Sequence, residues 1–194
     1  MTLSKLAVAA LLGAAVTFSS TAIAADPEDT MIITLKGGEV VVALRPDLAP
    51  RHVEQIKALV RDGEYDNVAF HRVIDGFMAQ TGDVQFGDME GGYDPARAGT
   101  GGSSRPDLPA EFSNQPFVRG VVGMARAQDP NSANSQFFIM FAPAPSLDGS
   151  YTVVGEVESG MEFVDAIKKG DPARNGVVAD PDRMLDVRIA ADGE

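Results

Sequence analysis

Cysteine is absent from the 194-residue chain, and histidine occurs only twice, at His52 and His71. Without cysteine the protein has no disulfides, no thiolate metal ligands and no lipid attached through a thiol, so packing must supply its stability. One histidine falls on a predicted helix and the other on a predicted strand, which is not the ligand set of a zinc site. We therefore expect no bound metal.

Basic residues are also few. The chain has 16 Lys and Arg against 28 Asp and Glu, and its formal net charge is −12. A surface of this sign repels phosphate backbones and anionic lipid headgroups. The acidic residues are spread over predicted loops and helix faces, without a pair that suggests acid–base catalysis. The composition predicts no nucleic-acid partner and no membrane association of the mature protein.

The apolar run near the start of the chain, residues 6–16, is shorter than the roughly 20 residues that cross a bilayer. It follows the positive charge of Lys5 and precedes small residues, Ala22 and Ala24, at the spacing that a signal peptidase requires. This pattern favours a signal peptide over a membrane anchor. We predict a signal peptide at residues 1–24 and an exported, periplasmic mature domain at residues 25–194.

The remaining composition, 44% hydrophobic and 23% charged residues with 20 Gly and 12 Pro, is typical of one loop-rich globular domain. Apolar residues alternate around Gly37-Gly38 within residues 30–46 and predict a β-hairpin. Apolar residues from Val53 to Val60 recur at helical spacing and predict an amphipathic helix that begins near Pro50. The other predicted elements are strands within residues 118–127, 135–140, 151–158 and 183–191, a second helix within residues 159–170, and a loop at residues 86–109. Because strands follow one another without alternating helices, we predict a mainly β fold, a closed antiparallel barrel capped by two helices.

Candidate chemistry lies in "FHRVIDGFMAQTGD", residues 70–83, where Arg72 stands among apolar residues. A cation on an apolar surface is costly unless it is paired, solvated or used. A second stretch, "GMARAQDPNSANSQFFIMF" at residues 123–141, has a similar composition, and in each strand one face would carry glutamine beside apolar side chains. These apolar side chains could simply be core, but Arg72 favours a groove for a neutral, apolar ligand with one polar handle.

Two other site types are weaker candidates. A Ser/His/Asp hydrolase would need His71 as its base, with Ser135 or Ser146 as nucleophile, but no GxSxG elbow is present. We therefore interpret His71 as a structural histidine that forms hydrogen bonds near the site. The glycines of "GTGGSS", residues 99–104, lack the strand, helix and lysine of a phosphate-binding loop and indicate a flexible loop.

In these two stretches and in "LDGSYTVVGEV", residues 147–157, the chain resembles the cyclophilins, which are peptidyl-prolyl cis-trans isomerases. The resemblance runs from the hairpin at Met31 to the last strand, with the motifs in the family's order and spacing. It implies an eight-stranded antiparallel barrel with a helix over each open end. It also implies that Arg72 is the catalytic arginine and that Gln80 positions it and the peptide.

The resemblance further implies which residues bind the substrate. The proline pocket would be lined by Phe77, Met78, Phe138 and Leu147, and the peptide groove by His71, Ala125, Arg126, Ala127 and Gln136. The chain departs from well-known eukaryotic members on both sides of the "LDG" turn, at Ser146 and Tyr151. Ser146 replaces a tryptophan, which predicts weak cyclosporin binding, and Tyr151 replaces a histidine but keeps a ring in the pocket wall. Arg126 replaces an asparagine, which predicts a changed preference beside the proline.

An Xaa-Pro isomerisation breaks no covalent bond, so the implied reaction requires no nucleophile, metal or cofactor. The expected partners are proline-containing polypeptides, in particular other exported proteins whose folding the enzyme would assist, and we expect a monomer. A second hypothesis is a proline-peptide-binding or chaperone-like module that uses the same groove with little turnover. A pure binder would not need a donor aimed at the transition state, so Arg72 favours the isomerase.

Overall fold

The computed structural model describes residues 26–193. The predicted signal peptide and its cleavage site lie outside the described residues. Within the described range, no helix has both the length and the apolar character needed to cross a membrane.

The chain opens with the predicted hairpin. Strands β1 (Thr30–Leu35) and β2 (Gly38–Leu44) pair antiparallel, with Ile33 opposite Val40 and the turn at Lys36. Alternate side chains of both strands are fully buried, which is the pattern of a sheet with one face in a core. The hairpin prediction is confirmed.

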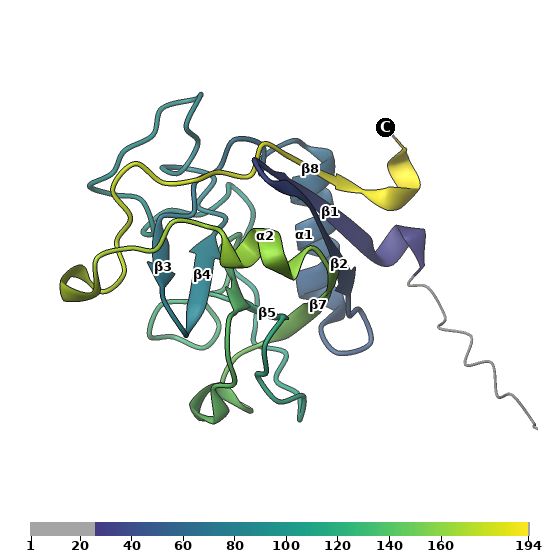
Figure 1. Cartoon of the computed structure of the whole chain (residues 1–194). Coiled ribbons are helices and arrows are strands. Elements are labelled where there is room, and N and C mark those ends of the chain that lie inside the picture. The colour runs from purple at the N-terminus through teal and green to yellow at the C-terminus, as the bar shows by residue number, and fades with distance from the viewer. Residues whose placement is uncertain (1–25, 194) are drawn as a thin grey trace, which may run out of the picture.

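Eight strands form one antiparallel sheet in the order β3-β4-β6-β5-β7-β2-β1-β8. Strands β3 and β4 lie at one side of the molecule and β1 and β8 at the other (Figure 1). The later strands are β3 (Arg72–Ile74), β4 (Met78–Thr81), β5 (Val121–Met124), β6 (Phe137–Met140), β7 (Val153–Ser159) and β8 (Asp186–Ile189). The predicted mainly β architecture is therefore confirmed.

The predicted closure of the barrel is wrong, because the sheet is an open half-barrel with β3 and β8 as its edges. Between the segment around β3 and the segment before β8, where a closed barrel would have a strand ladder, the described residues form only isolated backbone hydrogen bonds. One of them runs from Phe70 N to the Asp182 carbonyl at 2.8 Å. The segment before β8 cannot run as a regular strand beside β3. Asp180 has a φ of 52°, in the left-handed region, and Pro181 has no N–H to donate to a ladder.

Both predicted helices are present. Helix α1 (Pro50–Arg61) starts at its proline, and Gly63, with a φ of 72°, follows its end, as the sequence predicted. Helix α2 (Met161–Asp165) is shorter than predicted because the Lys168 N–H donates to the Asp182 carboxylate at 2.8 Å rather than to a helical carbonyl.

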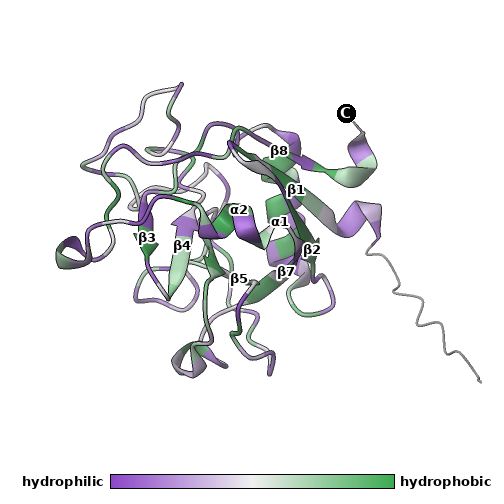
Figure 2. Cartoon of the chain, in the orientation of Figure 1, coloured by the Kyte–Doolittle hydropathy of each residue, from purple (hydrophilic) through white to green (hydrophobic). Residues whose placement is uncertain are grey.

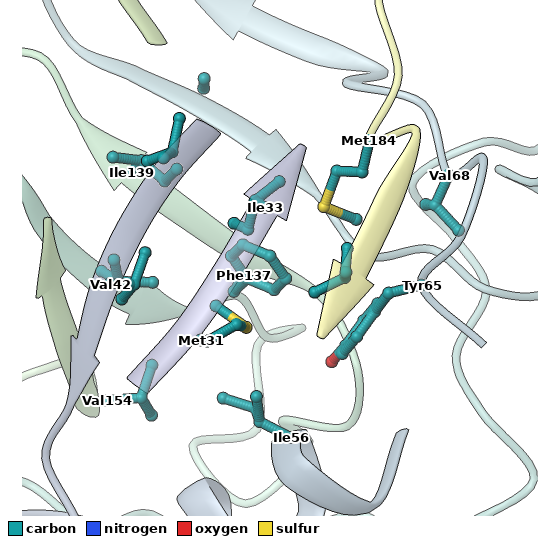
Figure 3. Close-up of a cluster of buried hydrophobic side chains, with 14 of the residues drawn as sticks. Met31, Ile33, Val42, Ile56, Tyr65, Val68, Phe137, Ile139, Val154 and Met184 are labelled. Carbon is teal, nitrogen blue, oxygen red and sulfur yellow. The ribbon is translucent and has the colours of Figure 1, made fainter. Parts of the chain in front are cut away.

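The buried hydrophobic residues of the strands belong to two separate clusters. The barrel core, shown in Figure 3, contains Phe137 and Ile139 of β6, and Tyr65 packs edge-on against Phe137 at 5.6 Å between ring centroids. The alternate residues of β6, Phe138 and Met140, belong to a second cluster on the outer face of the sheet. Figure 2 shows hydrophobic segments on strands such as β3, β5 and β7, whereas many of the hydrophilic residues lie in the loops. The central strands are thus buried on both faces, and the outer cluster forms the base of the candidate site.

Candidate active site

Strands β3 and β4 form a hairpin that places Arg72 directly opposite Gln80. The turn contains Gly76, whose φ of 68° lies in the left-handed region that glycine tolerates. Since side chains alternate along a strand, Met78 and Gln80 share the outer face while Ala79 enters the barrel core. On this outer face Arg72 Nη1 donates a 3.0 Å hydrogen bond to Gln80 Oε1.

A second residue, Asn175, holds the other side of the Arg72 guanidinium. Arg72 Nε donates to the Asn175 carbonyl and Nη2 donates to Asn175 Oδ1, both at 3.1 Å. Burial lowers the pKa of Arg72 from its ordinary value, but the guanidinium remains charged at neutral pH. Sequence analysis missed Asn175: its Asn-Gly pair signals a turn, but nothing in that signal points to an arginine 103 residues away.

Glutamine side chains extend this arrangement across the sheet. Gln80 Nε2 donates to Gln136 Oε1 at 3.0 Å, and Gln136 Nε2 donates to the Gly101 carbonyl at 2.7 Å. The guanidinium of Arg72 is therefore connected through two amides to the loop that contains Gly101. We call this chain of hydrogen bonds the glutamine relay. It fixes the orientation of each side-chain amide, because the oxygen accepts from one neighbour while the NH₂ group donates to the next.

Beside Arg72 lies a pocket of about 170 Å³, which we call the proline pocket after the ligand that the family resemblance implies. It is lined by Arg72, Phe77, Met78, Gln80, Ala125, Arg126, Phe138, Leu147 and Tyr151. The structure thus brings together all four residues predicted to grip the proline ring. Phe117, which sequence analysis did not identify, supports the wall by stacking on Phe138 at 5.8 Å between centroids. Tyr151 meets both rings edge-on, at 5.9 Å from Phe138 and 6.5 Å from Phe117.

A second pocket of about 390 Å³ adjoins the proline pocket and shares Gln80, Ala125 and Arg126 with it. Its remaining lining residues are Gly99, Thr100, Gly101, Ala127, Ser132, Asn134 and Gln136. The predicted groove residues Ala127 and Gln136 therefore lie here and not in the proline pocket. Because the two pockets share three lining residues they are adjacent, and we refer to them together as the groove.

The glycine-rich wall of the second pocket is tied to a buried carboxylate. Asp83, with 0% exposure, accepts hydrogen bonds from the Gly99 N–H at 2.7 Å and the Gly101 N–H at 2.9 Å. A side chain at Gly101 would collide with Asp83 Oδ1, since an added Cβ would lie 2.4 Å from it. The "GTGGSS" segment is thus anchored at its first glycines, a feature that its composition alone does not indicate.

His71 is buried behind this loop and lines neither pocket. Its ring lies against Gly99, and neither ring nitrogen has a hydrogen-bond partner among the described residues. Burial lowers the pKa of His71 to about 4, against a smaller opposing effect of the Asp83 charge, so the ring is neutral at neutral pH. Ser135, the serine considered with His71, is buried and donates instead to the Gly82 carbonyl at 2.7 Å. This geometry does not assemble a hydrolase triad.

Comparison with known proteins identifies the family to which this site belongs. Residues 30–189 match the family described as "Cyclophilin type peptidyl-prolyl cis-trans isomerase/CLD". The chain belongs to the cyclophilin family of peptidyl-prolyl cis-trans isomerases. The protein is therefore an enzyme of the isomerase class.

Relatives of this cyclophilin match most of its length. It is 64% identical over 189 residues to the "Probable peptidyl-prolyl cis-trans isomerase" of Brucella suis, covering 97% of this chain and 96% of that one. It superposes on the crystal structure of cyclophilin AquaCyp293 from Hirschia baltica with a TM-score of 0.73 at 26% identity, covering 88% of this chain and 77% of that one. A cyclophilin-type isomerase of Cryptosporidium parvum, solved in the presence of the dipeptide Ala-Pro, gives a TM-score of 0.68 at 26% identity, covering 82% of this chain and 98% of that one.

Proposed function

We propose that Arg72 is the catalytic donor of this cyclophilin and that the proline pocket binds the ring of the substrate proline. The observation that carries the proposal is the placement of an arginine at the rim of an apolar pocket, held by Gln80 and Asn175 and without a carboxylate partner among residues 26–193. A half-buried cation is costly unless it is paired, solvated or used by a ligand. This one is oriented by neutral oxygens and keeps its charge for a ligand.

The reaction explains why these groups suit one another. Rotation about an Xaa-Pro bond breaks amide resonance against a barrier of about 18–20 kcal/mol. In the twisted transition state the prolyl nitrogen regains a lone pair that a planar amide does not offer. A guanidinium donor aimed at that nitrogen binds the transition state better than either ground state, which is the condition for catalysis.

Arg72 alone cannot supply the whole acceleration. Shortening an isomerisation time of about 100 s to about 1 ms requires a factor of about 10⁵, or roughly 7 kcal/mol. One hydrogen bond to a charged group contributes about 1.5–3 kcal/mol. We assign the remainder to the proline pocket, where Phe77, Met78 and Phe138 would hold the pyrrolidine ring and exclude the water that stabilises the planar amide.

The clients and the location are part of the proposal. The signal-peptide pattern of residues 1–24 supports export to a periplasm, where the enzyme would assist the folding of other exported proteins. The dipeptide in the Cryptosporidium parvum structure supports proline-containing polypeptides as ligands. The net charge of −12 argues against nucleic acid as a partner, and we propose a monomer.

An isomerisation assay on an Xaa-Pro test peptide tests the assignment of Arg72. The Arg72→Ala variant should lose at least tenfold in kcat/KM while its circular dichroism and urea denaturation remain those of the folded protein. Arg188→Ala, which removes a surface arginine paired with Glu39, is the matched control and should retain the wild-type rate. Wild-type activity in Arg72→Ala would remove the catalytic role. Peptide binding without any acceleration by the wild type would instead favour the binding module.

Expression of the full chain tests the proposed location. Cell fractionation should recover the protein outside the cytoplasm, and sequencing of its N-terminus should begin at Ala25. A cytoplasmic protein with an intact N-terminus would contradict export without affecting the assignment of Arg72.

A further inference from the structure

The charged side chains that line the groove are all positive. Arg72 and Arg126 line the proline pocket, and Arg126 also lines the second pocket. Within the described part of the chain, neither pocket has an aspartate or glutamate in its lining. The groove is thus a local positive region on a protein whose net charge is −12.

Most of the other arginines are paired with carboxylates. Between residues 26 and 193, ion pairs are formed by Arg45, Arg51, Arg61, Arg97, Arg105, Arg119, Arg183 and Arg188. No ion pair within that range involves Arg72, Arg126 or Arg174, and Arg174 is exposed and lines neither pocket. Carboxylates are abundant on this surface, yet none has been placed against the two cations of the groove. Their charge therefore remains available to a ligand.

Arg126 is fixed in position by neutral groups. Its Nη1 donates to the Ala127 carbonyl at 2.9 Å and its Nη2 to the Ser150 carbonyl at 3.1 Å. The guanidinium carbon lies 4.4 Å from the centroid of the Tyr151 ring, a cation–π contact. These contacts orient the guanidinium at the boundary between the two pockets without neutralising it, because carbonyls and a phenol ring carry no net charge.

From this arrangement we infer that Arg126 is a specificity residue that favours clients with a carboxylate side chain close to the isomerised proline. The inference rests on the proposed function, since it assumes that the proline ring occupies the proline pocket. A polypeptide that crosses from this pocket into the second one passes Arg126, so a glutamate or aspartate near the proline comes within reach of its charge. Arg72 cannot serve this purpose equally, because it is the proposed catalytic donor and its guanidinium is held in place by Gln80 and Asn175.

The expected preference is modest. Arg126 is only partly buried, and a partly exposed ion pair changes affinity by about two- to fivefold at moderate ionic strength. Salt should reduce the preference, because the Debye length falls from about 10 Å at 0.1 M to about 3 Å at 1 M. A lysine at the same position of the client should be disfavoured by repulsion.

A peptide series tests the inference. Each peptide contains one proline, with Glu, its neutral isostere Gln, or Lys placed in turn at the three positions before the proline and the two after it. At one or more of these positions the wild type should show a Glu-to-Gln ratio of kcat/KM of about two to five, with Lys below Gln. The ratio should fall toward one in Arg126→Gln and be largely retained in Arg126→Lys. Because each ratio is taken within one variant, a general loss of activity on losing the Tyr151 contact does not affect it.

The control is Arg188→Gln, which changes the net charge by the same amount on β8, at the opposite edge of the sheet from β3, and should keep the wild-type ratio. A ratio of one at every position in an active wild type would overturn the inference and leave the proposed function intact. A preference that survives in Arg126→Gln, or that falls equally in Arg188→Gln, would also overturn it. A wild type without isomerase activity would instead remove the proposed function.

Discussion

Asn175 holds Arg72 through both its main chain and its side chain, with hydrogen bonds of 3.1 Å from Arg72 Nε to the Asn175 carbonyl and from Nη2 to Asn175 Oδ1. The backbone of the same segment pairs with β3, since Arg72 and Val177 form an isolated β-bridge. The orientation of the proposed catalytic donor thus depends on a turn near the other end of the chain. Asn175 has a φ of 54°, in the left-handed region, which asparagine tolerates better than most residues.

Replacing the Asn175 side chain should reduce catalysis more than binding. Asn175→Ala and Asn175→Gly both remove the acceptor Oδ1 while keeping the carbonyl, so each leaves Arg72 with one contact fewer. Loss of about 1 kcal/mol of positioning lowers kcat by about fivefold with little change in KM. Measurement of kcat and KM on a proline peptide checks this split.

The pair of variants separates positioning from stability. Glycine adopts the left-handed conformation freely whereas alanine is strained there, so Asn175→Ala should unfold at lower urea concentration than Asn175→Gly. A positioning role predicts similar losses of kcat in both variants despite their different stabilities. A loss of kcat that is clearly larger in the less stable Asn175→Ala than in Asn175→Gly would show that Asn175 has only a structural role.

The two glutamines should act as one unit. Gln80 joins Arg72 to Gln136, and Gln136 continues to the Gly101 carbonyl, so removal of either amide leaves the other without its partner. We expect Gln80→Ala and Gln136→Ala each to lower kcat/KM by about three- to tenfold, and the double variant to lose less than the product of the two effects. A double-mutant cycle in kcat/KM measures this coupling. Strictly multiplicative effects would contradict the relay.

Sequence patterns predicted much of this molecule because they are local. The period-2 alternation in "SQFFIM" sorts Phe137 and Ile139 into the barrel core and Phe138 into the outer cluster, as the structure has them. The helical spacing from Val53 to Val60 likewise predicted α1. Each of these inferences needs only a few consecutive residues and one rule of backbone geometry.

What sequence reasoning missed depends on contacts between distant segments. Nothing local shows that Asn175 reaches Arg72 or that Glu111, in the loop after residue 109, accepts hydrogen bonds from the backbone N–H groups at the start of α1. The predicted closure failed for a related reason, since it required the chain before β8 to run beside β3. The placement of His71 in the groove was carried over by family resemblance, whereas its actual burial is decided by the loop that covers it.

Asp83 should be essential to the shape of the second pocket. Its carboxylate is fully buried and accepts from four backbone N–H groups, those of Gln85, Phe86, Gly99 and Gly101. In Asp83→Asn an NH₂ group replaces one of the two carboxylate oxygens, so one pair of N–H donors, either Gln85 and Phe86 or Gly99 and Gly101, loses its acceptor. The free energy of unfolding should fall by about 2–4 kcal/mol, and amide hydrogen exchange should accelerate at the pair that loses its acceptor.

A partly exposed aspartate of the neighbouring loop provides the control for Asp83. Asp94 pairs with Arg97 at the surface, and Asp94→Asn should lower the free energy of unfolding far less than Asp83→Asn because solvent screens the pair. Equal destabilisation by the two substitutions would show that the buried hydrogen bonds of Asp83 contribute no more than a surface ion pair.

His71 should make the stability of this cyclophilin depend on pH. The pKa of His71 is lowered to about 4 in the fold, chiefly by burial, whereas an exposed histidine in the unfolded chain has a pKa of about 6.5. Between these values the unfolded chain binds a proton that the folded protein does not. The contribution of neutral His71 is therefore complete above about pH 6.5 and is lost as the pH falls toward 4, amounting to roughly 3 kcal/mol over that window.

Urea denaturation of the wild type and of His71→Gln at pH 7.5, 6.5, 5.5 and 4.5 measures this contribution to the free energy of unfolding. Carboxylates that titrate in the same range affect both proteins alike, so the difference between the two free energies of unfolding isolates His71. It should be largest at pH 7.5 and shrink as the pH falls, because the wild type must then bury a charge or release a proton on folding. Two pH profiles that run parallel from pH 7.5 to 4.5 would show that the ring is protonated as readily in the folded protein as in the unfolded chain.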